Sequence, residues 1–542
     1  MLLGLAVLLI PCTRFPLTRA EAMYALIPKE MLAAGTWLTP TLNGVPYLDK
    51  PPLLYWLNMA GYLVFGVSEH TARIPTLLIA LGELWFTYLI GVRLLNPRAA
   101  WLGSAALLTC IGFFAHHLQL LTDHLISLTL LAALYALLRW QEAPARRWAA
   151  LFFGAMAAGF LSKGFIALSF PALIGLAYAW QQRQRRLLAL LFSPLGISLA
   201  LLLIVPWLVL AEQASPGTWQ HQIVNEQIMR FLGQRQPPDI TPFPIPAFWF
   251  FLGLWLMPWT LLLPQALYRF WRTTGPTRPQ AGRGRLLLIW PAAVMLFFTA
   301  ASSRIEYYSL PALPALALIV GWRLDGYLAD GRDRTLAWLM LGLGLLGATI
   351  FLSLPFLEKL CADNRREFIG LFALVRPAAL MASLTLPMTA LLGAWLALWR
   401  PRWAVGCYLA MAGVLVFLTY QAMAALSPLL SDRLTGEYVR VNAGPQDVVV
   451  MEAIEEFEYG ASLAFYSGRG VLMVQRLGLP QFPYPVPREK NYLISPEQLA
   501  ELWRGPHRVY VQLDDVVAAE PYLADAHAAL TLPGKRLLVN RP

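Results

Sequence analysis

Ionisable side chains gather at four places in a chain that is otherwise mostly apolar. The first place is the stretch from Arg19 to Trp56, which contains Glu21, Asp49 and Lys50. The other three are the segments HHLQLLTDHLISL, FLSKGF and SSRIEYYSLPALP, and the segment NEQIMRFL adds a further acid and a further arginine. Such groups are costly to keep at membrane depth or at the membrane edge, so each is a candidate for a functional site. The candidates outside the first stretch are Asp123, Lys163, Arg304, Tyr308, Glu226 and Arg230.

Cations and carboxylates in this combination suit the transfer of a group from a lipid phosphate. A sugar that leaves a polyprenyl phosphate needs cations that bind the growing negative charge of the phosphate. It also needs a carboxylate that accepts the proton of the attacking hydroxyl. The candidates for phosphate binding are Lys50, Lys163, Arg304 and Arg230, and those for proton transfer are Glu21, Asp123 and Asp49.

Each candidate also has a purely structural interpretation. Asp123 stands at the start of an apolar span, where a carboxylate stabilises a helix N-terminus. Lys163 could extend its side chain to the membrane surface, and the arginine and second tyrosine of SSRIEYY could anchor that turn at the interface. His116 and His117 resemble a metal-binding pair, but adjacent side chains point apart on a helix, so we do not expect both to bind one ion.

The composition is that of a polytopic membrane protein. Hydrophobic residues make up 58% of the 542 residues and charged residues only 13%, which is far from the soluble norm. The net charge of +11 does not indicate a nucleic-acid partner, because the basic residues lie in short loops between apolar spans. The four cysteines are widely spaced and form no CxxC pair, so they are expected to be buried apolar residues.

Thirteen apolar runs are expected to cross the membrane. The first, Met1 to Cys12, is shorter than the roughly 20 residues a span needs, so it predicts a clipped or short first helix or, as the lesser alternative, a cleaved signal segment. The other twelve are expected at residues 72–93, 98–117, 120–139, 147–162, 164–180, 189–211, 246–268, 286–301, 308–322, 336–357, 378–399 and 403–425.

The positions of the arginines predict the orientation. Arginines cluster in the six loops after the even-numbered spans, so these loops are expected on the cytoplasmic side. The first loop (13–71), the 212–245 loop, the SSRIEYY turn and the C-terminal tail then lie on the periplasmic side of the cell inner membrane. All four groups of candidate residues share this outer face.

The chain is expected to divide into a membrane domain, 1–425, and a small periplasmic α/β domain, 426–542. In the tail the β-type runs DVVVME, GVLMV, HRVYVQL and KRLLV alternate with helical stretches. Ser495, Pro496 and Glu497 are typical of a helix start. About 115 residues suffice for one independent core. No set of catalytic residues stands out in this tail.

The order of several motifs resembles that of the bacterial glycosyltransferases related to protein O-mannosyltransferases. The first-loop run EMLAAGTWLTPTLNGVPYLDKPPLLYW is long and specific, and SEHTARIPT, TDHL, SKG and SSRIEYYSLPALP follow it in order. Within these enzymes the chain is most similar to the aminoarabinose transferases of lipid A. The resemblance covers the first ten spans closely and the tail loosely, through ASLAFYSGRGVLMV.

The resemblance implies a membrane enzyme of the C-type glycosyltransferase fold. Such an enzyme takes a sugar from a polyprenyl-phosphate donor and passes it to lipid A or another lipid or envelope acceptor at the outer face of the inner membrane. We expect a monomer surrounded by membrane lipids, with one divalent metal ion as the candidate cofactor. By correspondence, Asp49 and Lys50 meet the metal and the donor phosphate, Asp123 is a second membrane-edge acid, and Lys163, Arg304 and Tyr308 lie near the phosphate.

The first half of the first loop departs from the family pattern. The family reads Asp-Glu-x-Arg-Tyr-Ala-Glu where residues 20–26 read AEAMYAL, so Ala20 replaces the usual catalytic aspartate and Met23 its arginine partner. Glu21 could serve as the base from one position along, although one residue on a helix turns the side chain by about 100°. Gln227 stands where relatives have a histidine. The alternatives are a transporter or flippase of lipid-linked sugars, which would favour internal repeats that we do not find, and a catalytically reduced relative that only binds lipid phosphate.

Overall fold

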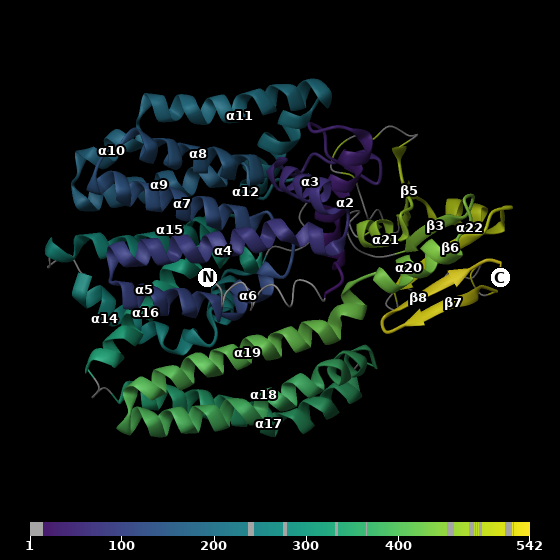
Figure 1. Cartoon of the computed structure of the whole chain (residues 1–542). Coiled ribbons are helices and arrows are strands. Elements are labelled where there is room, and N and C mark those ends of the chain that lie inside the picture. Colours follow the sequence, from purple (N-terminus) through teal and green to yellow (C-terminus); the bar gives the residue numbers. More distant parts are fainter. Residues whose placement is uncertain are drawn as a thin grey trace.

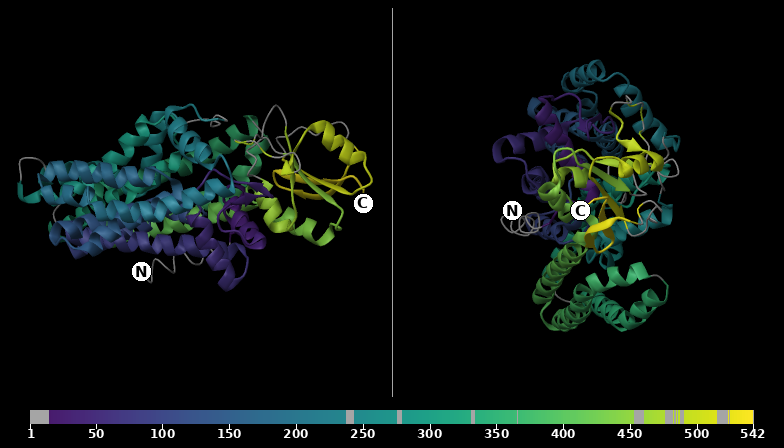
Figure 2. Two further views of the ribbon diagram at one scale, coloured as in Figure 1. Left: turned by 90° about the horizontal axis from the view of Figure 1, so that it is seen from above. Right: turned by 90° about the vertical axis from the view of Figure 1, so that its right-hand side faces the viewer.

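Long helices make up most of the molecule, and a β-sheet lies at one end of them (Figure 1; Figure 2, left). The computed structural model describes residues 15–236, 243–274, 279–330, 334–364, 366–452, 460–475, 482, 484, 486, 490–514, 523 and 525–541. The expected first helix over Met1 to Cys12 falls outside the described residues.

Seven helical segments of the described chain are long and apolar enough to cross a membrane, or eight if one bent pair of helices counts as a single span. A polytopic helical membrane protein is therefore confirmed, while the number of thirteen spans stays a prediction. The seven segments are Glu69–Leu94, Asp123–Glu142, Arg185–Ala214, Gly282–Ala300, Glu306–Ala329, Arg376–Trp399 and Arg402–Leu430.

Helices occupy all twelve of the expected positions after the first. The expected span at 189–211 covers parts of two consecutive helices, Arg185–Leu191 and Pro194–Ala214, and two further expected spans are broken. The span at 98–117 is two helices that meet at an angle of 58°, and the span at 246–268 is interrupted by a 3₁₀ turn, η2 (Trp259–Leu261). Pro258, which lacks an amide N–H, stands at the second break. The helices of this part are α3 (Leu53–Phe65), α4 (Glu69–Leu94), α5 (Pro97–Leu108), α6 (Ile111–His117), α7 (Asp123–Glu142), α8 (Arg146–Lys163), α9 (Ile166–Gln182), α10 (Arg185–Leu191), α11 (Pro194–Ala214), α12 (Arg230–Leu232), α13 (Ile245–Leu256), α14 (Leu263–Thr274), α15 (Leu286–Ala300), α16 (Leu313–Asp330), α17 (Thr335–Asn364), α18 (Arg366–Trp399) and α19 (Pro401–Leu430).

The first loop begins with helix α2 (Arg19–Ala34) and a small hairpin. Thr18 caps α2 in a capping box with Glu21, and Gly35 ends the helix with φ 64°. The strands β1 (Thr41–Leu42) and β2 (Val45–Pro46) pair across an Asn-Gly turn, where both residues adopt positive φ. Glu30 accepts hydrogen bonds from the backbone of that turn. These contacts therefore fix the backbone that leads into the following Asp-Lys-Pro-Pro segment.

Small residues let two central helices pack closely. A Cβ atom added to Gly321 of α16 would lie 2.2 Å from the backbone nitrogen of Gly103 in α5. Apolar helices in a membrane gain their mutual stability from such close packing, because lipid already surrounds their apolar surfaces. The contact fixes α16 and with it the preceding 3₁₀ turn η4 (Glu306–Ala312), which carries part of the candidate site.

The loop after α11 contains a π-helix of ten residues, η1 (Gln220–Met229). A π-helix is rare, and short ones are often found at functional sites. Within η1, His221 and Glu226 are buried although the segment is polar. The loop therefore turns ionisable side chains inward, towards the first loop.

The C-terminal residues form a six-stranded mixed sheet of order β5-β4-β3-β6-β8-β7. The β5, β4, β3 and β6 strands are parallel, and β8 and β7 add an antiparallel hairpin. The capped helix start at Ser495 is confirmed, whereas β5 and β7 had not been expected. The elements are α20 (Arg433–Asn442), β3 (Val448–Glu452), α21 (Gly460–Ser467), β4 (Leu472–Val474), β5 (Leu493–Ile494), α22 (Pro496–Arg504), β6 (Val509–Asp514), β7 (His527–Leu532) and β8 (Lys535–Val539).

Candidate active site

A polar cavity of about 680 Å³ lies between the first loop, the start of α7 and the η4 turn. Four segments far apart in sequence converge here, as the common outer face of these segments had predicted. All of the predicted site residues except Glu21 and Glu226 line this cavity. They are Asp49, Lys50, Asp123, Lys163, Arg230, Arg304 and Tyr308.

An apolar groove of about 490 Å³ adjoins the polar cavity. Phe165, Phe231, Phe297 and Phe298 line it, together with aliphatic side chains. The groove and the cavity share a short border of cationic and hydroxyl-bearing side chains. The shared residues are Lys50, Lys163, Arg230, Ser303 and Tyr308.

Asp123 and Lys163 contact each other at the wall of the cavity. Asp123 is the first residue of α7 and Lys163 the last residue of α8, and the Lys163 ammonium donates to the Asp123 carboxylate. The same ammonium lies 4.4 Å from the ring centroid of Tyr308. Lys163 therefore has two partners at the cavity wall, which the purely interfacial interpretation of this lysine does not include.

The backbone conformation and the packing at Gly164 explain the glycine of the SKG motif. Gly164 ends α8 with φ 84°, and a Cβ atom there would lie 2.7 Å from the side chain of Gln227. Gln227 in turn donates to the backbone carbonyl of Lys163 at 3.2 Å. A glycine is therefore required for η1 to pack against the turn that carries Lys163.

Glu226 of η1 is the centre of a cluster of cations. Lys50 Nζ lies 3.5 Å from the Glu226 carboxylate, Arg230 NH1 lies 3.1 Å from it, and Arg235 Nε donates to it at 2.5 Å. Burial alone would raise the pKa of Glu226, but the positive charges of Lys50, Arg230 and Arg235 outweigh this effect and hold the pKa at about 2. The cluster thus keeps Lys50 and Arg230 at the groove and Arg235 at the polar cavity.

Asp49 contacts a histidine that the sequence analysis did not single out. His221 Nε2 lies 2.6 Å from Asp49 Oδ1 and 4.0 Å from Glu226 Oε1. One ligand atom from each of the three residues lies within 4.8 Å of the others. A histidine nitrogen with two carboxylate oxygens fits a divalent ion such as Zn²⁺, so the residues suit the expected metal, with Asp49 as one ligand.

Glu21 lies outside the cavity, contrary to its expected position beside the reacting groups. Its carboxylate is buried, lies 2.9 Å from Arg73 NH2 of α4 and accepts from the backbone N–H of Thr18 at 3.1 Å. Burial raises the pKa of Glu21 despite the attraction of Arg73. The turn of about 100° between neighbouring helical residues points Glu21 into the core, while Ala20 faces the cavity.

The positions that depart from the family pattern do line the cavity. Ala20 and Met23 are both part of its wall, and neither offers a charged group. Arg19, one residue earlier, is also at the wall but is held by Asp432 and Asp514 of the C-terminal part. Within the described part of the chain, the cavity wall therefore has no charged side chain at positions 20 and 23, where the family pattern has an acid and an arginine.

Arg304 uses its guanidinium mainly to hold its own turn. It donates to the backbone carbonyls of Phe243 at 2.9 Å, Phe298 at 3.2 Å and Ala301. Most of the hydrogen bonds of the guanidinium are therefore explained by the interpretation of Arg304 as an anchor of the turn. Arg304 still borders the cavity and fixes the turn that carries Tyr308.

Two site residues, His221 and Arg235, were missed. Arg235 lines the cavity and lies 3.6 Å from Asp49 Oδ2. Both residues are ionisable groups of the outer 212–245 loop, so a search of that loop beyond NEQIMRFL would have found them. As expected, His116 and His117 point apart: the His116 ring packs on Trp255 at the cavity wall, and His117 faces the interior.

The comparisons with known proteins agree with these motifs. Residues 49–210 match the family described as dolichyl-phosphate-mannose-protein mannosyltransferase. An undecaprenyl phosphate-alpha-4-amino-4-deoxy-L-arabinose arabinosyl transferase of Pseudomonas fluorescens is 31% identical over 368 residues, which are 66% of this chain and 64% of that protein. The equivalent transferase of Edwardsiella ictaluri is 27% identical over 90% of this chain and 87% of that protein.

The match to the Pseudomonas relative spans less than two thirds of that protein, 64% of its length. The structure is also similar to ArnT from Cupriavidus metallidurans bound to undecaprenyl phosphate, with a TM-score of 0.82 at 20% identity over 99% of this chain and 96% of that chain. The resemblance seen in the motifs is therefore confirmed: the chain is similar to the bacterial undecaprenyl-phosphate aminoarabinose transferases and has the fold of ArnT.

Proposed function

We propose that the chain is a membrane glycosyltransferase that moves a sugar from a polyprenyl-phosphate donor to lipid A or another cell-envelope acceptor. The sugar is aminoarabinose or another pentose or hexose. The observation that carries the proposal is the border between the apolar groove and the polar cavity, where Lys50, Lys163 and Arg230 lie together. A lipid phosphate has this same division into an apolar chain and an anionic head.

The groove suits the polyprenyl chain of the donor. Its phenylalanine and aliphatic side chains offer apolar surface, and burial of such surface contributes roughly 25 cal/mol per Å². The phosphate then lies at the border, within reach of Lys50, Lys163 and Arg230, with Tyr308 beside them. Arg304 acts by holding the η4 turn. The sugar projects into the polar cavity, where the acceptor binds.

The reaction we propose is displacement at the anomeric carbon. An acceptor oxygen forms a bond to that carbon while the bond to the phosphate oxygen breaks, and the phosphate leaves with the electron pair. The border cations stabilise the charge that develops on the leaving phosphate. Where the acceptor is a hydroxyl, its proton passes to a carboxylate of the cavity, for which Asp123 and Asp49 are the candidates.

A divalent metal ion fits beside the donor phosphate. Asp49, His221 and Glu226 are the residues that would hold it, and when bound it would supply positive charge to the phosphate. Lys50 lies 3.5 Å from the Glu226 carboxylate, and Arg235 lies 3.6 Å from that of Asp49. These cations orient Glu226 and Asp49 towards His221.

The topology that goes with this function is the one expected from the sequence. Thirteen spans in residues 1–425 put the cavity and the domain of residues 426–542 on the periplasmic side of the inner membrane. The protein acts as a monomer among membrane lipids, without a nucleic-acid partner. The arginine-rich loops at the opposite ends of the helices support this orientation.

Glycosyl transfer by purified membranes tests the proposal directly. Lys50→Ala is expected to weaken donor use and Asp123→Asn to lower the rate of transfer by about 10²-fold or more. Matched controls are Lys490→Ala and Asp525→Asn, because both residues are exposed in the C-terminal part. Full transfer activity in Lys50→Ala and Asp123→Asn would contradict the proposed site.

A catalytically reduced relative that only binds lipid phosphate is the second candidate. The observation that favours it is the pair of uncharged residues, Ala20 and Met23, at the cavity wall. Such a protein would bind undecaprenyl phosphate with loss of affinity in Lys50→Ala but show no transfer. Translocation of the lipid without transfer would instead favour a flippase.

A further inference from the structure

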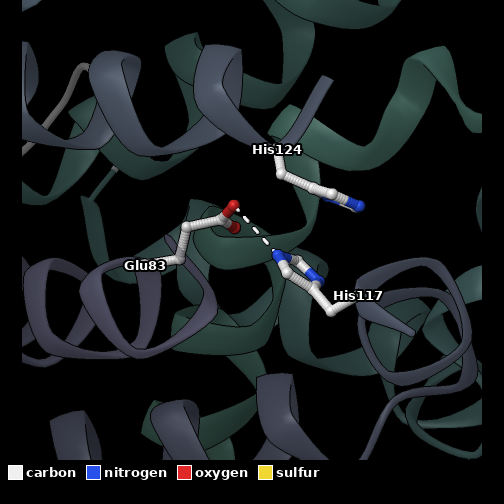
Figure 3. Close-up of side chains that lie close together, drawn as sticks. All are labelled: Glu83, His117 and His124. Carbon is white, nitrogen blue, oxygen red and sulfur yellow. Dashed lines mark hydrogen bonds and ion pairs between the residues drawn. The ribbon is translucent and has the colours of Figure 1, made fainter. Parts of the chain in front are cut away.

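A second group of metal-binding side chains lies inside the helical bundle, away from the proposed active site. Glu83 comes from α4, His117 from α6 and His124 from α7, and the three side chains lie close together in Figure 3. All three residues are buried, with 2%, 4% and 1% of their surface exposed. One ligand atom from each lies within 4.8 Å of the other two.

The hydrogen bonds of the two histidines fix their tautomers. His117 Nδ1 lies 2.7 Å from the backbone carbonyl of Phe113, and a carbonyl only accepts, so Nδ1 carries the proton. His124 Nε2 lies 2.9 Å from the backbone carbonyl of His116 and is protonated for the same reason. In the neutral rings, His117 Nε2 and His124 Nδ1 then hold lone pairs. Metal-binding histidines commonly donate their other N–H to a carbonyl in this way.

The carboxylate completes the set. Glu83 Oε1 lies 3.1 Å from His117 Nε2, along the dashed line of Figure 3. Two ligands of a tetrahedral Zn²⁺ ion, each about 2.0–2.1 Å from the metal, are roughly 3.3 Å apart. The His124 ring stacks on that of His117 with centroids 4.0 Å apart, which keeps a ligand atom of His124 within 4.8 Å of those of Glu83 and His117.

The charges around Glu83 also point to a cation. Among the described residues, no lysine or arginine pairs with Glu83, and the neutral His117 ring beside it supplies no positive charge. A buried carboxylate at membrane depth is costly without a positive partner. Two neutral imidazoles and one carboxylate are ligands that first-row transition metals prefer, whereas Mg²⁺ and Ca²⁺ prefer oxygen alone.

We propose that Glu83, His117 and His124 bind one divalent transition-metal ion, with Zn²⁺ as the expected occupant and water in the fourth position. The ion would join α4, α6 and α7. His124 follows Asp123 directly, and His116 precedes His117 at the cavity wall, so the ion would fix the α6–α7 turn behind the proposed active site. The site does not depend on the proposed glycosyl transfer.

Metal binding by the purified full chain tests this site, and the outer Asp49–His221–Glu226 group must be removed first. In a His221→Gln background, chelator-treated protein is expected to take up about one Zn²⁺ per chain, measured by elemental analysis. Adding His124→Gln or Glu83→Gln is expected to weaken the binding of Zn²⁺, or of Co²⁺ followed by its visible absorption, by about 100-fold or more. His70→Gln on the same background is the matched control, because His70 is exposed.

Glu83→Gln keeps the shape of the side chain and a hydrogen bond to His117. This variant is therefore expected to fold like its parent. Size-exclusion profiles and metal-free melting temperatures of the variants should match those of the His221→Gln parent. No metal uptake by the His221→Gln protein would overturn the proposal. Unchanged uptake after His124→Gln and after Glu83→Gln would overturn it equally.

Discussion

Lys163 lies where the polar cavity and the apolar groove meet, and it contacts both Asp123 and the ring face of Tyr308. A hydrogen bond to a charged group typically contributes about 1.5–3 kcal/mol. Lys163→Met is therefore expected to raise the KM for the polyprenyl-phosphate donor by about 10- to 100-fold. Steady-state kinetics with varied donor would measure this change.

Lys490→Met is the matched control for Lys163→Met, because Lys490 is exposed and far along the chain in the C-terminal part. Its KM should equal that of the unaltered protein. An unchanged donor KM in Lys163→Met would show that the lysine only pairs with Asp123. Such a result would remove Lys163 from the phosphate site but leave the groove in place.

At the scale of single residues, the sequence could predict which ionisable side chains lie at the cavity, but not which side chains each of them contacts. The cost of charge at a membrane edge identified Asp49, Lys50, Asp123 and Lys163 without any structure. The direction in which Glu21 points depends on the rotation of α2, which is set by Thr18 capping and by Arg73 from another helix. That long-range pairing leaves no local signal in the sequence.

Helix α2 depends on the buried pair between Glu21 and Arg73, which joins it to α4. Removal of one partner from a buried ion pair typically costs about 3–5 kcal/mol, because the other charge stays buried without its partner. Glu21→Ala is therefore expected to destabilise the protein by about this amount, with loss of the capping box included. Thermal unfolding in detergent would measure it.

The double variant Glu21→Gln with Arg73→Met separates this structural role from a catalytic one. Because neither charge remains, much of the lost stability should return, and kcat per folded molecule should stay close to that of the unaltered protein. A catalytic base would instead lower kcat in every Glu21 variant, whatever its stability. That pattern would restore Glu21 to the reaction.

At the scale of elements, hydropathy located the helices well because an apolar run of this length has few other stable forms. The break between α5 and α6 and the π-helix η1 were not predictable, since both depend on packing against distant segments. The contact between Gln227 and Gly164 is one such case. The strand β5 has only two residues, so its sequence carries no strand pattern, and it is recognised only by its pairing with the parallel strand β4.

At the scale of the whole molecule, the first loop and the C-terminal sheet form one unit (Figure 1). A single hydrophobic cluster includes Tyr24 and Tyr55 of the first loop together with Met451 and Tyr510 of the sheet. Beside it, Arg19 donates to Asp432, which follows α19. The C-terminal part therefore packs against the first loop, which carries Asp49 and Lys50.

Asp432 is the centre of this connection, and its titration gives a pH dependence. It accepts from Arg19 Nε at 3.0 Å, Lys535 Nζ at 2.9 Å and Gln512 Nε2 at 2.8 Å. Burial alone would raise the pKa of Asp432, but the charges of Arg19 and Lys535 outweigh this effect and hold the pKa at about 2, below the ordinary 3.8. A lowered carboxyl pKa stabilises the folded state above the unfolded pKa, and the stabilisation is lost as the pH falls.

The contact between the first loop and the C-terminal part is therefore expected to weaken by about 2 kcal/mol as the pH falls from about 4 to about 2, since one pKa unit corresponds to about 1.4 kcal/mol. Hydrogen exchange of α20 and β8 measured across this interval would report the loss. Asp432→Asn should exchange faster at neutral pH and lose the dependence between pH 4 and 2 that belongs to this residue, because no carboxyl is left to titrate. Asp525→Asn, at an exposed position, should keep it, and equal pH dependence in the two variants would show that Asp432 does not control the contact.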